Sequence, residues 1–185
     1  MADDALWYEA ALLVGVTNAL NVVADSPLDS LEPASPSAEA QAVFGEIRAF
    51  YDRADVPLAF RRVAADPGYL ADLWGAARRA FADNRLTRRH KEALAFAVSV
   101  TTRSAFGAAF HLAEMRRLGV GERGVMEVLG VTQMFSSYTK IADTLQLEPD
   151  MDGLAAVDRS PAPGGTAPKR EERERPAPTR PPEAP

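Results

Sequence analysis

Apolar side chains recur at every third or fourth position in each long segment of the chain. In residues 4–25 the recurring apolar positions are Leu13, Val16, Leu20 and Val23. This spacing places them on one face of an α-helix, whereas a half-buried strand needs apolar residues at every second position. No segment of the sequence sustains that alternation. The chain is therefore predicted to be all-α, a bundle of six or seven helices.

Residues that favour helix ends divide this pattern into elements. The predicted caps are Ser35 before Pro36, Asp66 before Pro67, Thr87 and Ser104 at helix starts, and Gly119 at a helix end. Helices are expected to begin near residues 4, 36, 57, 67, 88, 105 and 122, the last reaching about 146. Residues 93–100 are apolar nearly all round, which favours a buried central helix. Four aromatic residues are expected in the core: Trp74, Phe96, Phe106 and Phe110.

Composition divides the chain into three parts. Residues 1–34 hold the first helix and a loop rich in proline and serine, residues 35–150 form the main helical domain, and residues 151–185 form a tail. Eight of the 14 prolines lie in the last 25 residues. Such a segment cannot bury enough surface to offset the entropy lost on ordering, so the tail is expected to be disordered. Its charged run, residues 169–175, is either solvated or becomes helical on a partner.

The residue types exclude several kinds of site. The chain has no cysteine, which removes disulfides, thiolate nucleophiles and cysteine metal ligands together. Its two histidines, His90 and His111, are too few for a histidine-rich metal site, and we expect no metal and no cofactor. The net charge is −5, and basic residues do not form the clustered face that a nucleic-acid partner requires.

The apolar stretch 12–24 is the one segment that resembles an export signal or a membrane span. It follows Asp3, Asp4 and Glu9, whereas an export signal carries positive charge there. Two asparagines interrupt it, and taken alone it is too short to cross a bilayer. We therefore expect an amphipathic helix of a cytoplasmic protein that has no membrane partner.

The first helix has a counterpart near the end of the chain. Glu9 and Asp25 align without gaps with Glu127 and Asp143. The matched apolar pairs are Leu13/Val131, Val16/Met134, Leu20/Tyr138 and Val23/Ile141. One interpretation is that residues 1–34 hold the last helix of a lost or reduced repeat. The other is that two amphipathic helices match in this way by chance.

Glu92 begins the most informative spacing in the sequence. Eleven residues separate it from Ser104, two separate Ser104 from Gly107, and three separate Gly107 from His111. This resembles the signature of the alkylhydroperoxidase D and carboxymuconolactone decarboxylase superfamily, in which the same intervals join Glu, Cys, Cys and His. The superfamily resemblance covers residues 56–150, and within it residues 56–74 resemble the first helices of peroxidase-related members and of the group I 2-haloacid dehalogenases. The resemblance implies an alkylhydroperoxidase D-like helical bundle that assembles as a homo-oligomer, a trimer or a hexamer.

Both cysteine positions of that signature are replaced in this chain, by Ser104 and Gly107. Phe106 stands where the family has a histidine between the cysteines. In the peroxidase branch one thiolate attacks the oxidant and the second thiol resolves the product. A hydroxyl and a hydrogen cannot take over that exchange, so a thiol peroxidase is excluded.

The residues at the signature positions of this chain allow several interpretations. Glu92 and His111 match the family's proton relay and form either a buried acid/base pair or a structural pair, or Glu92 only complements its helix dipole. Ser104 is a nucleophile or an N-cap, and its distance of two helical turns from His111 favours the cap. Gly107 marks space for a ligand or close packing of a helix. Arg103 is the arginine that would hold a carboxylate ligand.

Three functions are consistent with these residues. The loss of both thiols from a retained scaffold favours a non-redox, oligomeric binding or accessory protein. The alternative is a lyase or hydrolase of a small organic acid, in which Glu92 and His111 supply acid/base chemistry and Arg103 binds the substrate. A third hypothesis is a scaffold or cargo protein recruited through its tail. Whether the protein is an enzyme is left open.

Overall fold

Seven α-helices follow one another through residues 4–27 and 32–147, which the computed structural model describes. They are α1 (Asp4–Ala24), α2 (Ala38–Tyr51), α3 (Leu58–Arg62), α4 (Pro67–Phe81), α5 (Arg88–Thr101), α6 (Ala105–Arg117) and α7 (Glu122–Leu145). No strand occurs within the two described ranges, so the all-α prediction is confirmed. The predicted disordered tail, residues 151–185, and residues 28–31 of the first loop lie outside the described residues.

Four of the five predicted helix caps are confirmed. The side chains of Asp66, Thr87 and Ser104 each accept a hydrogen bond from the backbone N–H three residues further on. Gly119 has a φ of 81° just after α6, a conformation that glycine adopts without a Cβ clash. These contacts satisfy backbone groups that helix ends leave unpaired, and they fix where α4, α5 and α6 begin and where α6 ends.

The predicted cap at Ser35 is wrong. α2 begins at Ala38, and the Ser37 hydroxyl accepts the hydrogen bond from the backbone N–H of Ala40 at 3.2 Å. Both serines offer a capping hydroxyl, so local sequence does not choose between them. The later serine, Ser37, is the N-cap of α2. It lies three residues before Ala40, the first buried residue of the helix.

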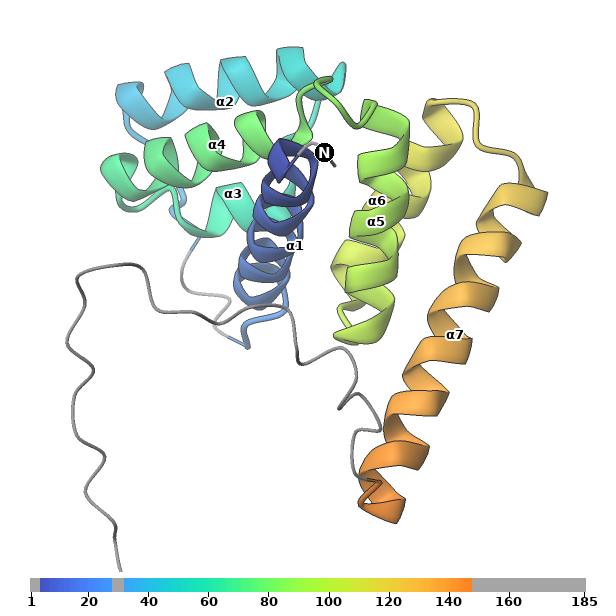
Figure 1. The fold of residues 1–185 in the computed structure, drawn as a ribbon. Helices are drawn as coiled ribbons and strands as arrows, with labels where there is room; N and C mark the ends of the chain where they lie inside the picture. Colours follow the sequence, from blue (N-terminus) through green and yellow to red (C-terminus); the bar gives the residue numbers. More distant parts are fainter. Residues whose placement is uncertain (1–3, 28–31, 148–185) are drawn as a thin grey trace, which may run out of the picture. The chain divides into compact units, whose positions relative to one another are not determined.

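α1 packs against α3, α4, α5 and α6 (Figure 1). Its buried residues follow the spacing predicted from the sequence: Leu13, Val16, Thr17, Leu20, Asn21 and Ala24. The helix is 21 residues long, and by length and apolar composition alone it could cross a membrane. Length therefore does not exclude a membrane span, contrary to the sequence-based expectation for residues 12–24. In this fold one face of the helix is used for contacts within the protein.

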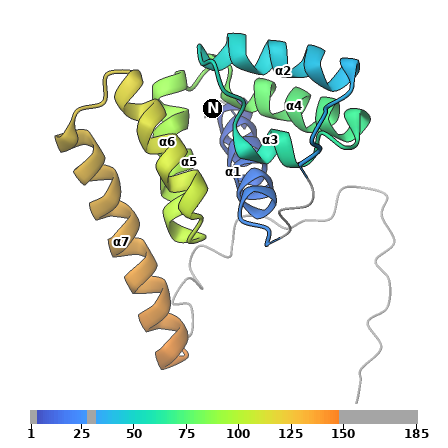
Figure 2. The ribbon, with the colours of Figure 1, turned by 180° about the vertical axis from the view of Figure 1, so that it is seen from behind.

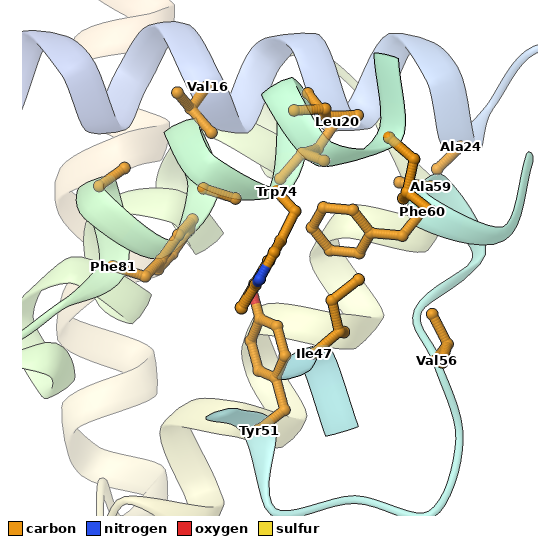
Figure 3. Close-up of a cluster of buried hydrophobic side chains, with 14 of the residues drawn as sticks. Val16, Leu20, Ala24, Ile47, Tyr51, Val56, Ala59, Phe60, Trp74 and Phe81 are labelled. Carbon is orange, nitrogen blue, oxygen red and sulfur yellow. The ribbon is translucent and has the colours of Figure 1, made fainter. Parts of the chain in front are cut away.

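Aromatic rings fill the space between α1, α2, α3 and α4. Figure 3 shows Trp74, Phe60 and Tyr51 gathered below Leu20. The Trp74 ring lies 5.7 Å from the Phe60 ring, centroid to centroid, at 89°, an edge-to-face arrangement that aromatic quadrupoles favour. The indole N–H of Trp74 donates to Glu46 at 3.0 Å. The predicted core position of Trp74 is confirmed, since the residue is 3% exposed.

Polar contacts hold both ends of α1. The ammonium of Lys91, on α5, is fully buried and lies 2.5 Å from a Glu9 carboxylate oxygen. Glu9 also accepts hydrogen bonds from the backbone N–H groups of Arg85 and Leu86, between α4 and α5. At the other end, the Arg62 guanidinium donates to backbone carbonyls in the last turn of α1 and just after it, those of Val23, Ala24 and Ser26. The position of α1 is therefore fixed by ion pairing and capping as well as by apolar burial.

α5 contacts four helices, α1, α4, α6 and α7 (Figure 2). Its burial is nevertheless one-sided. Ala95, Phe96 and Ser99 are buried, whereas Leu94 is 39% exposed. The prediction that residues 93–100 are buried all round is therefore wrong, because the outer side of α5 is only partly covered. The first turns of α7 cover some of it, through Val125, Val128 and Leu129.

We predict that Glu9→Gln lowers the free energy of unfolding at neutral pH by about 2–4 kcal/mol, because the buried Lys91 ammonium loses its counter-charge. Burial opposes ionisation, but the hydrogen bond and charge of Lys91, together with two backbone N–H groups, hold the pKa of Glu9 below 4.5. The stabilisation is therefore complete above 4.5 and is lost as the pH falls through the lowered pKa. Urea unfolding from acid to neutral pH measures both effects.

Asp72→Asn is the matched control for this variant. It removes the same charge from an exposed position on α4 and should change the unfolding free energy by less than about 0.5 kcal/mol. Equal losses in the two variants would contradict a stabilising buried ion pair at Glu9.

Candidate functional site

Glu92 and His111 meet inside the bundle. Glu92 lies in the second turn of α5 and His111 in the middle of α6, two helices that pack together. A Glu92 carboxylate oxygen, Oε2, lies 2.7 Å from His111 Nδ1, and the two side chains are 0% and 4% exposed. The two residues that resemble the family's relay are therefore in contact. A catalytic role for them is still a prediction.

Arg88 occupies the other side of the Glu92 carboxylate. Its Nε donates to Glu92 Oε1 at 2.6 Å, so both carboxylate oxygens have a partner. The guanidinium lies 4.5 Å from the centroid of the Phe50 ring and 4.9 Å from that of Tyr51, within cation–π distance. Sequence reasoning missed this residue, although Arg88 and Glu92 have the i, i+4 spacing of a helical ion pair.

Glu114 extends the charge network along α6. Its carboxylate lies 3.5 Å from Arg88 Nη2 and 2.7 Å from Arg117 Nη2, and Arg53 Nη1 lies 3.8 Å away. The hydrogen bond to Glu114 raises the pKa of Arg117 above its ordinary value, against the effect of burial. Glu114 is 1% exposed and was not predicted as a site residue. The buried carboxylates of Glu92 and Glu114 thus each contact arginine guanidinium groups. Pairing of this kind is how buried charge is normally compensated.

Three rings enclose the imidazole and its carboxylate. Phe81 stacks on His111 with ring centroids 5.6 Å apart and an interplanar angle of 10°, and Phe110 meets its edge at 5.2 Å. Burial raises the pKa of Tyr51, the charges of Glu92 and Glu114 raise it further, and Arg88 lowers it. Tyr51 therefore stays a neutral phenol and does not supply a base at this site.

Ser104 caps α6 and does not contact His111. Its hydroxyl accepts the hydrogen bond from the backbone N–H of Gly107 at 2.9 Å. His111 lies seven positions after Ser104, about 10 Å along the helix axis. The N-cap interpretation is confirmed, and a Ser104 nucleophile activated by His111 is not supported by this geometry.

The space beside Gly107 is filled by Asn21 of α1. The Asn21 amide nitrogen donates to Ser99 Oγ at 3.1 Å and to Thr102 Oγ1 at 3.3 Å. A Cβ atom on Gly107 would lie 2.5 Å from Ser99 Oγ and closer still to the Asn21 side-chain oxygen. Glycine is therefore required by close packing, as one of the two interpretations predicted, and the position holds no ligand space.

A cavity of about 10 Å³ adjoins His111. Its walls include Tyr51, Phe60, Phe106 and Phe110. A volume of this size holds about one water molecule. The site is therefore closed to an organic substrate in this conformation.

Arg103 does not reach the carboxylate–imidazole pair. It follows the last turn of α5, is exposed and has a φ of 61°. It lies eleven positions after Glu92, about 16 Å along the helix axis. The arginine beside Glu92 is Arg88 instead. His90 is exposed and bonded to Thr87, as expected for a solvated residue.

The acidic side chains and histidines bear on whether the chain could hold a metal ion. Within residues 4–27 and 32–147, no three His, Asp or Glu side chains are grouped so that they could hold a metal ion. The buried carboxylates are instead occupied by guanidinium and imidazole groups.

The all-helical bundle that holds Glu92 and His111 on neighbouring helices has an alkylhydroperoxidase D-like fold. Residues 67–147 match the Carboxymuconolactone decarboxylase family model. The chain is similar to the crystal structure of the alkylhydroperoxidase AhpD core from Rhodospirillum rubrum, with a TM-score of 0.59 and 26% sequence identity. The similarity covers 63% of this chain and 86% of that chain. No curated protein matches the chain.

The family match and the structural similarity together support the resemblance of this chain to the carboxymuconolactone decarboxylase and alkylhydroperoxidase D-like superfamily. The chain contains no cysteine, so neither redox thiol of the family signature is present. The family match begins at Pro67, the first residue of α4, so α1, α2 and α3 precede the matched region.

We predict that Gly107→Ala lowers the free energy of unfolding by about 1–3 kcal/mol, because the new methyl group overpacks the space that Asn21 and Ser99 occupy. The loss should appear even though alanine is favoured over glycine inside a helix by about 1 kcal/mol. Thermal and urea unfolding measure it. Asn21→Ala in the same chain should restore part of the loss by vacating the space.

Gly45→Ala is the matched control, because a Cβ atom there would meet no other atom within 4 Å. This variant of α2 should be more stable than the natural chain by about 0.5–1 kcal/mol. If Gly107→Ala were equally stabilising, the contact with Asn21 would not constrain the site.

Proposed function

We propose that this protein is a non-redox member of its superfamily that turns over no substrate and works as an oligomeric binding or accessory protein. The observation that carries this proposal is the closed environment of Glu92. Arg88 and His111 occupy its two oxygens, and the adjoining cavity holds about one water molecule. A working acid/base pair needs room for a substrate within hydrogen-bond reach.

The missing thiols support the same conclusion. At the two positions that resemble the family's redox cysteines, Ser104 is used as a helix cap and Gly107 is packed against Asn21. Neither residue can form a covalent intermediate with an oxidant. Glu92 and His111 form part of the interior, where Phe81 and Phe110 enclose the imidazole.

Oligomeric assembly belongs to this proposal because members of the superfamily that the chain resembles form trimers or hexamers. It is further supported by the large apolar side chains that α7 exposes. We also propose a cytoplasmic location, without a nucleic-acid or membrane partner, from the sequence features given above. Recruitment through the tail concerns residues outside the described ranges.

One observation favours a second candidate, a lyase or hydrolase of a small organic acid. In the tautomer in which His111 Nδ1 donates to Glu92, the other ring nitrogen, Nε2, is left without this partner. Nε2 is then the nitrogen able to exchange a proton with a molecule in the adjoining cavity. This function requires the aromatic wall at Phe106 and Phe110 to open.

A turnover assay separates the two candidates. We expect the purified protein to convert hydrogen peroxide with a thiol reductant, an unsaturated lactone and a 2-haloacid no faster than Glu92→Gln does, because no substrate reaches the pair. Product formation by the natural chain that Glu92→Gln or His111→Ala abolishes would overturn the proposal and establish the acid/base enzyme.

A structural role for Glu92 and His111 can be tested by the effect of His111 on stability. We predict that His111→Ala lowers the free energy of unfolding by about 2–4 kcal/mol, because the buried Glu92 carboxylate loses a hydrogen bond and a cavity is left between Phe81 and Phe110. His90→Ala, at the exposed histidine, should cost less than about 0.5 kcal/mol. Denaturant unfolding of both variants measures the difference, and similar values would argue against a structural role for His111.

A further inference from the structure

α7 carries an apolar face that nothing in the described part of the chain covers. Six large side chains on it are between 52% and 68% exposed: Val131, Met134, Phe135, Tyr138, Ile141 and Leu145. With 3.6 residues per turn, these six fall within an arc of about 120°. A different side of the helix, which includes Val125 and Leu129, packs in the cluster with Phe96 and Met115. α7 therefore has one face used within the chain and one open face.

The open face also lacks charge. No Asp, Glu, Lys or Arg occurs in residues 128–139, although 25% of the chain is charged. A helix whose outer side stays in water carries polar and charged residues there. This composition indicates that the open face of α7 is buried in the assembled protein.

α1 shows how a face of this pattern is used in the same protein. The ungapped alignment of α1 with α7 pairs Leu13, Val16, Thr17 and Leu20 with Val131, Met134, Phe135 and Tyr138. The four α1 residues are at most 9% exposed, because they pack against neighbouring helices. That packing site is already occupied by α1 in every copy and is held by the Glu9–Lys91 ion pair. α7 needs a different surface.

The tail is a poor match for this face. Residues 148–185 contain only three apolar side chains larger than alanine and proline: Met151, Leu154 and Val157. These three residues are too few to cover six large side chains spread over residues 131–145.

The spacing along α7 matches a second copy of itself. Apolar residues lie three, four and seven positions on either side of Tyr138, the spacing of a heptad seam. In an antiparallel pair centred on Tyr138 the facing residues are Phe135 with Ile141, Met134 with Ala142, and Val131 with Leu145. In this arrangement the large Met134 side chain faces the small Ala142 side chain. A parallel pair would set Met134 against Met134 and Ala142 against Ala142, which packs less well.

We propose that α7 pairs with α7 of a second copy of this chain, antiparallel and centred on Tyr138. The contact uses the same surface on both copies and has two-fold symmetry. Of the two assemblies that the resemblance implies, a hexamer with two-fold axes accommodates it and a lone trimer does not. This inference deepens the oligomeric part of the proposed function, and its failure would leave the outcome of the turnover assay unchanged.

Single cysteines test the pairing cleanly, because the chain has none of its own. Under mild oxidation Tyr138→Cys should form a disulfide-linked dimer at least about tenfold faster than Ser137→Cys, whose side chain points about 100° away. Val131→Cys alone should stay unlinked, whereas a mixture of Val131→Cys and Leu145→Cys should form the mixed dimer. Equal rates at positions 137 and 138 would overturn the pairing, and self-linking of Val131→Cys as fast as Tyr138→Cys would overturn its antiparallel direction.

Light scattering tests the assembly without cross-linking. Tyr138→Lys should lower the particle mass at least twofold, toward 19.9 kDa for one chain, while circular dichroism shows that the helices persist. Val14→Lys places the same charge on the exposed side of α1 and should leave the mass unchanged. A natural chain that is monomeric at high micromolar concentration would overturn the proposal. So would an assembly that Val14→Lys dissociates and Tyr138→Lys does not.

Discussion

The pairing of Arg88 with Glu92 is the interaction on which the interior depends. A carboxylate that is fully buried costs several kcal/mol unless an opposite charge and hydrogen bonds compensate it. Arg88 supplies both, and the rings of Phe50 and Tyr51 hold its guanidinium in place. The second carboxylate oxygen is then available to His111, which joins α5 to α6. The same arginine reaches Glu114, so one residue organises the charges of both helices.

The contacts of α1 explain why a helix outside the family match is part of the interior. Asn21 inserts an amide where the superfamily signature has a cysteine, and Glu9 neutralises the buried Lys91. These contacts join residues more than 75 positions apart in the sequence. α1 thus closes the interior from the side on which the thiol chemistry would have taken place.

Local signals predicted most of the fold. Apolar spacing and the caps at Asp66, Thr87 and Ser104 located the helices, and the spacing from Glu92 to His111 located the buried pair. Two predictions were wrong, the cap at Ser35 and the all-round burial of residues 93–100. They have a common cause, because nearby residues decide neither which serine caps α2 nor how far Leu94 is exposed. The contact between Asn21 and Gly107 could not be predicted either, since it requires the relative placement of α1 and α6.

The tight fit of Asn21 against Gly107 also limits which residues position 107 can accept. A single mutation that returned a cysteine to position 107 would set its Cβ into the Asn21 side chain. A cysteine at position 107 would therefore require a change in α1 as well, and that change alone would remove hydrogen bonds to Ser99 and Thr102. Because either change made by itself is expected to weaken the interior, the packing of α1 makes a thiol at this position unfavourable.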